Sequence, residues 1–306
     1  MINDLVSIIV MTYNSEKFIS ETLESILNQT YDNIEVIIAD DCSTDNTLGI
    51  AKSFLEINGF RNFKIIKTDK NSGIPFNCNN GIKNSNGKFI KIIAGDDILL
   101  PQCIYDNIEF IKINNSRVQF SKVINFIDID SKRLIIKSPY RYDKKNNYYD
   151  SKKQFYNMIF RNYIPAPTVF FSREIFEQYG YFNEKYRFFE DYPMWIKLLY
   201  SGEKIYFLDK DTVLYRQHSN SLSNSSDYLI NERMFENLKD FINEDIIKIL
   251  KEEKNYMYIY HKKIEIFKMQ LIISSGNKKG IFQKIAKMLN LLDPLWIANK
   301  IKELGI

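Results

Sequence analysis

The stretch VSIIVMTYN, residues 6–14, is a short run of apolar and β-branched residues that ends in a polar turn. Such a run predicts a buried β-strand over Val6–Met11. Apolar residues then recur at helical spacing as far as Leu27, which predicts an amphipathic helix with Ser15 as its N-cap. A strand, a polar turn and a helix in this order indicate the start of a βαβ unit.

The same pattern continues through the first hundred residues. Strands that alternate with helices favour a mostly parallel sheet covered on both faces, so the predicted fold class is α/β and Rossmann-like. The further strands are expected at Ile34–Ala39, Phe63–Lys67 and Phe89–Ala94, and the helices at Thr44–Phe54 and Phe76–Lys83.

Three polar clusters fall at the carboxyl ends of these strands. Thr12–Asn14 follows the first strand, Asp40-Asp41 the second and Asp96-Asp97 the fourth. In sheets of this kind, ligands bind at the carboxyl ends of the strands. Residues far apart in the chain would therefore meet at one edge of the sheet, and this convergence predicts a binding site.

The second hundred residues are less regular. The polar, tyrosine-rich stretch Tyr140–Asp150 is expected to be a loop. Ile164–Pro167 should be extended or turned, because a residue before proline avoids the helical region. The expected strands are Val118–Phe126, Leu134–Ile136, Val169–Ser172, Lys204–Leu208 and Val213–Arg216, and the expected helices are Phe155–Phe160 and Asp191–Ser201.

From about Asp227 the pattern becomes helical throughout. Helices are expected at Leu229–Leu250 and Lys254–Ser274, followed by an amphipathic segment that Pro294 interrupts. We therefore predict one domain over residues 1–225 and a helical C-terminal extension over residues 226–306.

The composition narrows the possible sites. With 45% hydrophobic residues the chain can bury a packed core. Three cysteines without paired spacing argue against a disulfide framework and favour a reducing, cytoplasmic compartment. Because only two histidines are present, a zinc site of Cys and His ligands is nearly excluded, and any metal should be a hard cation with oxygen ligands.

The segment 278–306 carries the excess positive charge. It holds six lysines and two acidic residues, a net charge equal to the +4 of the whole chain. An apolar stripe beside these lysines fits a helix on a membrane surface or a helix packed on its own domain, and we favour the first. The sequence lacks the broad basic face that nucleic-acid binding requires, a signal segment and an 18-residue apolar stretch.

The two aspartate pairs are the sharpest chemical features. Adjacent carboxylates such as Asp96-Asp97 repel each other unless a cation lies between them, and Mg²⁺ or Mn²⁺ suits carboxylate and phosphate oxygens. A lone pair is more often a solvated acidic turn, but this one lies between apolar stretches, which favours a site. Asp40-Asp41 either caps the following helix or accepts a hydrogen bond from a nucleotide base, and both can hold at once.

Nine stretches occur in a characteristic order: VSIIVMTYN at 6–14, LESILNQTY at 23–31, EVIIADDCSTD at 35–45, NSG at 71–73, NNGI at 79–82, GKFI at 87–90, DD at 96–97, EDYPMWIKL at 190–198 and YRQHSNSLS at 215–223. This ordered set resembles the inverting family 2 glycosyltransferases of the GT-A fold, of the type that builds bacterial surface polysaccharides. The resemblance covers about residues 5–223, and the ordered set is far more specific than any single piece.

The resemblance implies a role for each matching residue. Asp97 would bind the Mn²⁺ or Mg²⁺ that bridges the phosphates of a nucleotide-sugar donor, with His218 as a further metal contact. Asp191 would be the catalytic base, and Glu190 would support it. Thr12 and Asp41 would hold the base, Asp96 would face the ribose or diphosphate, and Arg216 would close over the diphosphate; the full set of expected donor-binding residues is Thr12, Tyr13, Asn14, Asp40, Asp41, Asn79, Asp96 and Arg216.

Other interpretations of these residues stay open. Glu190-Asp191 could simply begin a helix, because acidic residues stabilise a helix N-terminus. His218, taken alone, is more often a structural histidine than a ligand. Cys78 stands where many relatives carry an arginine, so that Lys83, Lys88 or Arg216 would have to supply the cation.

The resemblance therefore implies a metal-dependent hexosyl- or N-acetylhexosaminyltransferase that moves a sugar from a UDP-sugar to a hydroxyl of a glycan or lipid-linked acceptor at the inner face of the cytoplasmic membrane. Residues 1–100 would form the nucleotide-binding half of the catalytic domain and residues 101–225 the acceptor-binding half. An inactive GT-A-like nucleotide-binding assembly protein is one alternative, against which Asp97 and Asp191 argue. A different nucleotide enzyme, such as a dehydrogenase, is a second, against which the lack of Gly-x-Gly-x-x-Gly and Gly-x-x-x-x-Gly-Lys motifs argues.

Overall fold

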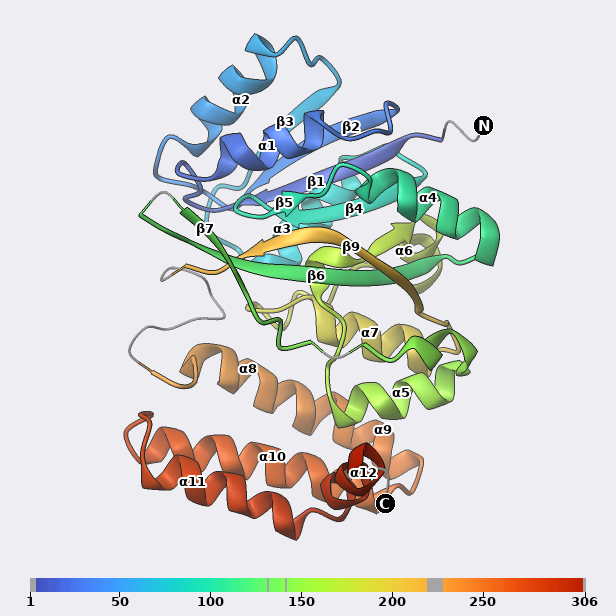
Figure 1. Ribbon diagram of the computed structural model, residues 1–306, viewed down its shortest axis with the longest axis vertical. Coiled ribbons are helices and arrows are strands. Elements are labelled where there is room, and N and C mark those ends of the chain that lie inside the picture. The colour runs from blue at the N-terminus through green and yellow to red at the C-terminus, as the bar shows by residue number, and fades with distance from the viewer. Residues whose placement is uncertain (1–3, 131, 141, 219–227, 305–306) are drawn as a thin grey trace. The chain divides into compact units, whose positions relative to one another are not determined.

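The computed structural model describes residues 4–130, 132–140, 142–218 and 228–304. The chain divides into two units, one of Met1–Phe155 and Tyr163–Gln217 and the other of Tyr156–Asn162 and His218–Ile306. The first unit holds the strands and the second consists of helices (Figure 1). The domain boundary predicted at 225/226 lies outside the described residues.

A nine-stranded sheet forms the centre of the first unit, in the order β3-β2-β1-β4-β8-β6-β9-β5 with β7 beside β6. The half from β3 to β4 is parallel, and its β1–β2 register runs from Val6 opposite Ile34 to Thr12 opposite Asp40. This half continues through β8, which pairs antiparallel with both β4 and β6. The strands are β1 Val6–Thr12, β2 Ile34–Asp40, β3 Phe63–Lys67, β4 Phe89–Ala94, β5 Ile98–Leu99, β6 Val118–Ile129, β7 Lys132–Ile136, β8 Phe170–Ser172 and β9 Tyr206–Arg216.

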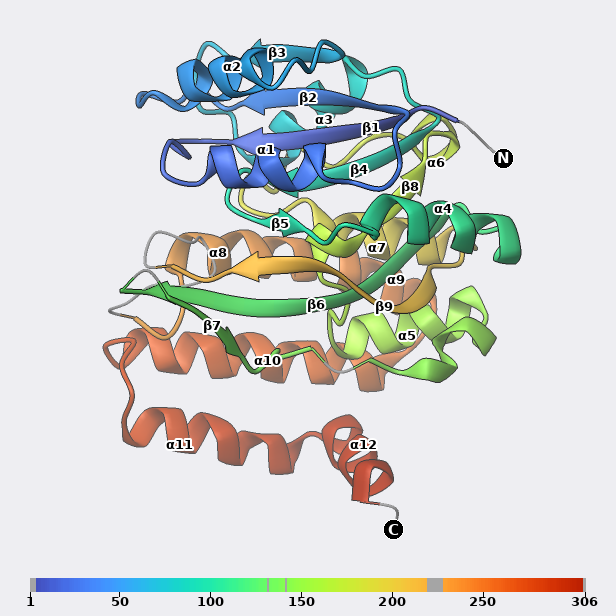
Figure 2. The same cartoon turned by 45° about the horizontal axis from the view of Figure 1, so that its top comes forward.

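Alternation along the strands decides which helix covers which face. Ile8 and Val10 belong to a core shared with α1 (Ile19–Leu27), α2 (Thr47–Ile57) and α4 (Cys103–Asn114). Ile9 points the other way and meets Gly81 of α3 (Ile74–Lys83), where any Cβ would overlap the Ile9 side chain. Glycine at this position therefore lets α3 lie close against the sheet, on the face opposite α1 (Figure 2). The predicted α/β class is confirmed.

The remaining elements of the first unit lie after β7. They are the 3-10 turns η1 Lys144–Tyr148 and η2 Ala166–Thr168 and the helices α5 Ser151–Phe160, α6 Glu174–Tyr179 and α7 Asp191–Tyr200, with α5 shared between the two units.

Several local predictions were wrong for physical reasons. Ser15 does not cap α1; its carbonyl accepts hydrogen bonds from the next turn, and its amide donates to Thr47 Oγ1 (2.7 Å). The two short strands expected at 204–208 and 213–216 form the single strand β9, because irregular pairing around Lys122 of β6 accommodates its charged middle. The elements β5, α4 and α6 were not predicted.

The second unit contains the helical extension. The expected helix over 229–250 is divided into α8 and α9 by a π-helical turn, η3, and α12 begins at Pro294, where the sequence indicated a break. The helices are α8 Glu232–Phe241, η3 Ile242–Ile246, α9 Ile247–Glu252, α10 Tyr256–Ser274, α11 Ile281–Met288, η4 Leu289–Leu292 and α12 Pro294–Leu304. Within the described ranges, every helix is too short or too polar to cross a bilayer.

A buried carboxylate joins the amino ends of three strands in the first unit. Glu35 of β2 accepts hydrogen bonds from Ser7 Oγ of β1 (2.6 Å) and from the amides of Asn86 (2.5 Å) and Gly87 (3.0 Å), just before β4. Burial would raise the pKa of Glu35, but these hydrogen bonds outweigh burial and hold the pKa below its ordinary 4.5. The ionised form is therefore the one that stabilises the fold.

Replacing Glu35 by Gln should lower the free energy of unfolding by about 2 kcal/mol near neutral pH, because one carboxylate oxygen and its charge are lost. The parent protein loses this contribution as pH falls through the depressed pKa of Glu35, so the two proteins should converge in acid. Urea unfolding across pH measures the difference. A constant difference at all pH values would contradict this account.

Candidate active site

The turns after β1 and β2 are joined by a buried aspartate. Thr12 Oγ1 donates to Asp40 Oδ2 (2.8 Å), and Asp40 also accepts from the amide (2.8 Å) and hydroxyl (2.5 Å) of Ser43. Asp40 is fully buried. Its carboxylate therefore shapes the site from inside the protein, and its predicted contact with a nucleotide stays a prediction.

The turn after β1 presents two of the expected donor-binding residues to the outside. Tyr13 is exposed, and Asn14 has a positive φ of 52° that asparagine tolerates better than most residues. The backbone amide of Asn14 donates to Ser43 Oγ (2.8 Å). Asn14 Oδ1 accepts from the backbone amide of Thr44 (2.9 Å). Asn14 thus fixes the two turns together and leaves the Tyr13 ring at the surface beside them.

Asp41 organises the loop that precedes α3. Its Oδ1 accepts from the Ser72 amide (2.7 Å) and from Thr68 Oγ1 (3.2 Å), and its Oδ2 accepts from the Gly73 amide (2.9 Å). A carboxylate offers about four lone pairs, so one acceptor position of Asp41 remains for a base N–H. The structure is compatible with the base contact predicted for Asp41.

Arg187 holds the same loop from the other side. Its carbonyl accepts from the Ile74 amide (3.1 Å), and its guanidinium donates to Asn71 Oδ1 (2.7 Å). Gly73 has a φ of 96°, and a Cβ there would overlap Arg187. The loop therefore lies between Asp41 and a residue only three positions before Glu190.

A second chain of contacts leads from Glu190-Asp191 to the end of β4. Burial raises the pKa of the Cys78 thiol well above its ordinary value, and the charge of Glu190 and then that of Asp191 raise it further. The Cys78 sulfur lies against Met11 of β1, which pairs with Ala94 of β4. The Met11 carbonyl accepts from the Gly95 amide (2.8 Å), immediately before Asp96-Asp97. The paired strands thus place Asp41 and Asp97 at one edge of the sheet, and the Arg187 contacts bring the segment that leads to Asp191 beside the loop that Asp41 holds.

Asp97 is the most constrained acid at this edge. It is 1% exposed; its Oδ1 accepts from the Arg216 amide (2.9 Å), and its Oδ2 is buried without a hydrogen-bond partner in the described part of the chain. Burial raises the pKa of Asp97 well above its ordinary value, and the Asp96 charge adds to this effect. A buried acceptor without a donor is costly, so this oxygen is suited to a cation.

The surrounding residues fit a cation that a substrate helps to hold. Among the described residues, no group of three or more His, Cys, Asp or Glu side chains is arranged as a complete metal cage. Mg²⁺ is commonly bound by one or two carboxylates together with phosphate and water oxygens. Asp97 therefore fits a metal that arrives with a diphosphate better than a resident structural metal. His218, the other predicted metal contact, begins the longer of the two segments that form the second unit, and its role stays a prediction.

The Arg216 side chain belongs to an ion cluster. Its guanidinium pairs with Glu21 of α1 and Asp128 of β6, and its Nε donates to the Asp96 carbonyl (2.8 Å). Arg133 of β7 pairs with the same two acids, at 2.7 Å from Glu21 and 3.2 Å from Asp128. Arg216 also lies over the rings of Phe18 and Phe126. The cluster fixes the end of β9, and with it the amide that binds Asp97, whereas the predicted contact of Arg216 with a diphosphate stays a prediction.

Asn79 joins α3 to the chain after α6. Its side-chain amide donates to the Phe182 carbonyl (2.9 Å) and to Glu184 Oε1 (2.8 Å), and its Oδ1 accepts from the Phe182 amide (2.9 Å). This buried residue positions the segment that leads to Glu190, and its expected donor contact is untested.

Glu190 and Asp191 occupy the start of α7. Burial, followed by the Asp191 charge, raises the pKa of Glu190 to about 8. The two adjacent carboxyls disfavour each other's ionisation, so the pair takes up a proton more readily than either acid would alone. The N-terminus of α7 favours negative charge on Asp191.

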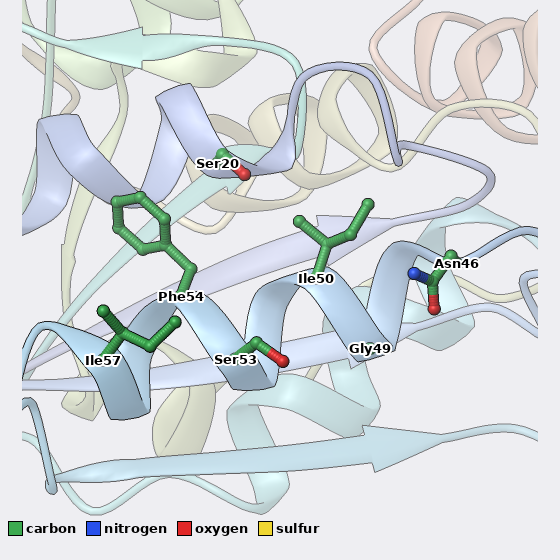
Figure 3. A pocket seen from close by; sticks show the side chains of 7 residues that line it. All are labelled: Ser20, Asn46, Gly49, Ile50, Ser53, Phe54 and Ile57. Carbon is green, nitrogen blue, oxygen red and sulfur yellow. The ribbon is translucent and has the colours of Figure 1, made fainter.

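A surface hollow is lined by none of these acids. It is bordered by α1 and α2 (Figure 3), and its lining residues are Ser20, Asn46, Gly49, Ile50, Ser53, Phe54 and Ile57. None of them is a carboxylate, so this hollow offers no chemistry that matches the strand-end acids.

Three residues that support the site were not predicted from the sequence. Lys91 is fully buried in β4, donates to the Val169 carbonyl (3.4 Å) and lies close enough to Asp97 for their charges to interact. A lysine within the apolar run Phe89–Ala94 was the available signal. Thr22 donates to the Asp97 carbonyl (2.8 Å). No pattern in the local sequence indicates this contact or the contacts of Arg187 with the loop before α3.

Comparison with known proteins places this geometry in context. The family model described as "Glycosyl transferase family 2" matches residues 7–180. An uncharacterized glycosyltransferase of Rickettsia prowazekii is 30% identical over 251 residues, which cover 81% of this chain and 74% of that protein. The Escherichia coli protein UDP-Glc:alpha-D-GlcNAc-diphosphoundecaprenol beta-1,3-glucosyltransferase WfaP is 31% identical over 224 residues, covering 72% of this chain and 80% of WfaP.

A solved structure agrees with the fold. Residues 1–349 of Staphylococcus aureus TarS, crystallised with UDP-GlcNAc, superpose with a TM-score of 0.59 and 25% identity, over 78% of this chain and 67% of that one.

Glu190 should make stability depend on pH. Its folded pKa of about 8 exceeds its ordinary 4.5, so the folded state keeps a proton that the unfolded state releases within that window, and the free energy of unfolding falls as pH rises through it. Glu190→Gln removes this effect. Between about pH 5 and about pH 8, the free energy of unfolding of the variant should therefore rise relative to that of the parent protein by on the order of 2 kcal/mol. Urea unfolding measures the gain. Glu174→Gln, at an exposed acid in the first turn of α6, is the control and should show none.

Arg216 should be more important for stability than Arg133. Arg216→Met removes a guanidinium that is 3% exposed and leaves its two partly exposed acids to Arg133 alone, so it should cost about 2 kcal/mol. Arg133→Met, at a guanidinium that is 34% exposed, should cost about 1 kcal/mol. Chemical denaturation compares the two variants. Unchanged stability of Arg216→Met, together with a lost affinity for UDP, would instead assign Arg216 to the donor.

Proposed function

The chain belongs to the family 2 glycosyltransferases, and from that premise we propose that it transfers a sugar from a UDP-sugar to a hydroxyl of a glycan or lipid-linked acceptor. We propose that the reaction inverts the anomeric configuration and depends on Mn²⁺ or Mg²⁺. The observation that carries the proposal is the buried, unpaired Asp97 oxygen at the sheet edge where Asp41 also lies. We propose that Asp191 faces the same site.

The donor side of the proposal rests on Asp41 and Asp97. Asp41 has a remaining acceptor position that suits the N3–H of uracil, and the exposed Tyr13 ring lies at the neighbouring turn. Asp97, with Asp96 beside it, would hold the metal ion. When bound, a divalent cation neutralises the charge that develops on the departing diphosphate. The UDP-GlcNAc complex of TarS and the name of WfaP favour a uridine nucleotide over others.

The acceptor side rests on Asp191. An attacking hydroxyl must lose a proton, and an ionised carboxylate within about 3 Å can take it. We propose that Glu190 holds the proton that the pair takes up, so that Asp191 carries the negative charge, and the start of α7 supports that charge. With a single base opposite the leaving group, direct displacement inverts the anomeric carbon.

The names of two relatives support a proposal for the acceptor. WfaP is named for transfer to a sugar on diphosphoundecaprenol, and TarS relatives are named for poly(ribitol-phosphate). We therefore propose an acceptor used in surface polysaccharide or lipooligosaccharide synthesis, reached at the inner face of the cytoplasmic membrane.

Two substitutions separate the roles. Asp191→Asn should lower transfer from a UDP-sugar by about 10²–10⁴-fold while calorimetry shows UDP binding with Mn²⁺ unchanged, because only the base is lost. Asp97→Asn should abolish the Mn²⁺ dependence of UDP binding. Asp106→Asn, which removes an acid of α4 paired with Lys210, is the control and should retain both activities.

A panel of nucleotide sugars with glycan and lipid-linked acceptors identifies the donor, and the anomeric proton signal of the product reports its configuration. UDP binding without transfer from any donor would favour the alternative of a non-catalytic assembly protein. Full transfer by Asp97→Asn and Asp191→Asn would overturn the proposed mechanism.

A further inference from the structure

The last helices of the second unit turn apolar side chains outward. In α11, Ile281 is 68%, Ile285 39% and Met288 64% exposed, although their spacing places them on one face of the helix. Ala286, on another face of α11, is buried. An amphipathic helix ordinarily buries its apolar stripe, so an exposed stripe indicates a surface that something else covers.

The exposed stripe continues beyond α11. Leu292, at the end of η4, is 60% exposed, and Ile297 and Ile301, one turn apart on α12, are 36% and 44% exposed. Within the second unit, α11 lies beside α10 and α12 follows it (Figures 1 and 2). We name the α11–α12 face by these residues: Ile281, Ile285, Met288, Leu292, Ile297 and Ile301.

The charges around this face have one sign. Lysines 278, 279, 284, 287, 300 and 302 are all exposed. The acid Asp293 is 2% exposed and is held by His261 Nδ1 (2.6 Å), where it also accepts from the amides of Leu295 and Trp296 at the start of α12. Because Asp293 is buried, all the exposed charged side chains described over residues 278–302 are positive.

Helical geometry places the lysines at the borders of the apolar stripe. Lys284 and Lys287 lie to one side of the Ile281–Ile285–Met288 stripe, and Lys300 and Lys302 lie to either side of Ile297 and Ile301. Lysine stems can lie along apolar surface while their ammonium groups reach outward to phosphates. This arrangement is that of a helix lying in a membrane interface.

We infer that the α11–α12 face binds the surface of an anionic phospholipid bilayer. The apolar residues would enter the boundary between headgroups and acyl chains, and the lysines would contact lipid phosphates. A second copy of the chain is a poor occupant, because a two-fold interface through this face would set lysines against lysines. The inference deepens the proposed function by naming the surface on which a lipid-linked acceptor would be met.

Vesicle co-sedimentation tests the inference with the full chain. The chain should bind vesicles of phosphatidylglycerol and phosphatidylethanolamine more tightly than vesicles of phosphatidylcholine, and added salt should weaken the binding. Ile285→Asp/Met288→Asp should reduce binding at least about tenfold, and Lys284→Glu/Lys287→Glu should do the same on anionic vesicles. Ile113→Asp, at an exposed isoleucine of α4 in the first unit, is the matched control and should bind as the parent does.

Two further measurements separate the possible outcomes. All variants should bind UDP as the parent does. A variant that binds UDP but no longer binds vesicles is folded, and its defect lies in the α11–α12 face. A failure of sugar transfer in the parent would count against the proposed function and leave the vesicle result standing. Equal binding to both lipid compositions, no effect of the α11–α12 substitutions, or a dimer in light scattering that Ile285→Asp dissociates would overturn the inference.

Discussion

A buried carboxylate oxygen that lacks a hydrogen-bond donor is the constraint on which the site depends. Asp97 lies at the end of a central strand, out of contact with water, and its Oδ2 has no partner among the described residues. Burial and the neighbouring Asp96 both disfavour its ionised form. A cation brought to this edge would pair with the oxygen and favour the ionised carboxylate, and this is the basis on which we propose a metal that accompanies a diphosphate.

The rest of the first unit keeps this edge in place. The Arg216 amide fixes one oxygen of Asp97, and the cluster of Arg216, Glu21 and Asp128 fixes the end of β9 that carries the amide. Asp40 holds the turns after β1 and β2 together, and Asp41 and Arg187 hold the loop before α3 between them. Several acids that the sequence predicts to bind the nucleotide-sugar donor thus form hydrogen bonds that hold the protein's own turns and loops in place.

The sequence was most informative where periodicity and local chemistry agree. The parallel strands and the acids at their ends could be predicted because each strand is a short apolar run followed by a polar turn. The ion cluster could not be predicted, because Glu21 and Arg216 are 195 positions apart and meet only through the tertiary fold. The single strand β9 was expected as two strands, because its charged middle breaks the apolar pattern. The pattern over 278–306 fitted a helix on a membrane surface, which we favoured, or a helix packed on its own domain, and the structure adds that the apolar stripe of α11 is exposed.

Crystals grown with UDP and Mn²⁺, examined by anomalous diffraction at the manganese edge, would test the central claim most directly. The account predicts one manganese peak in coordination contact with Asp97 Oδ2, the diphosphate on its far side, the uracil beside Asp41, and Asp191 facing the same cavity. A manganese peak away from Asp97, or a uridine bound elsewhere than Asp41, would contradict it.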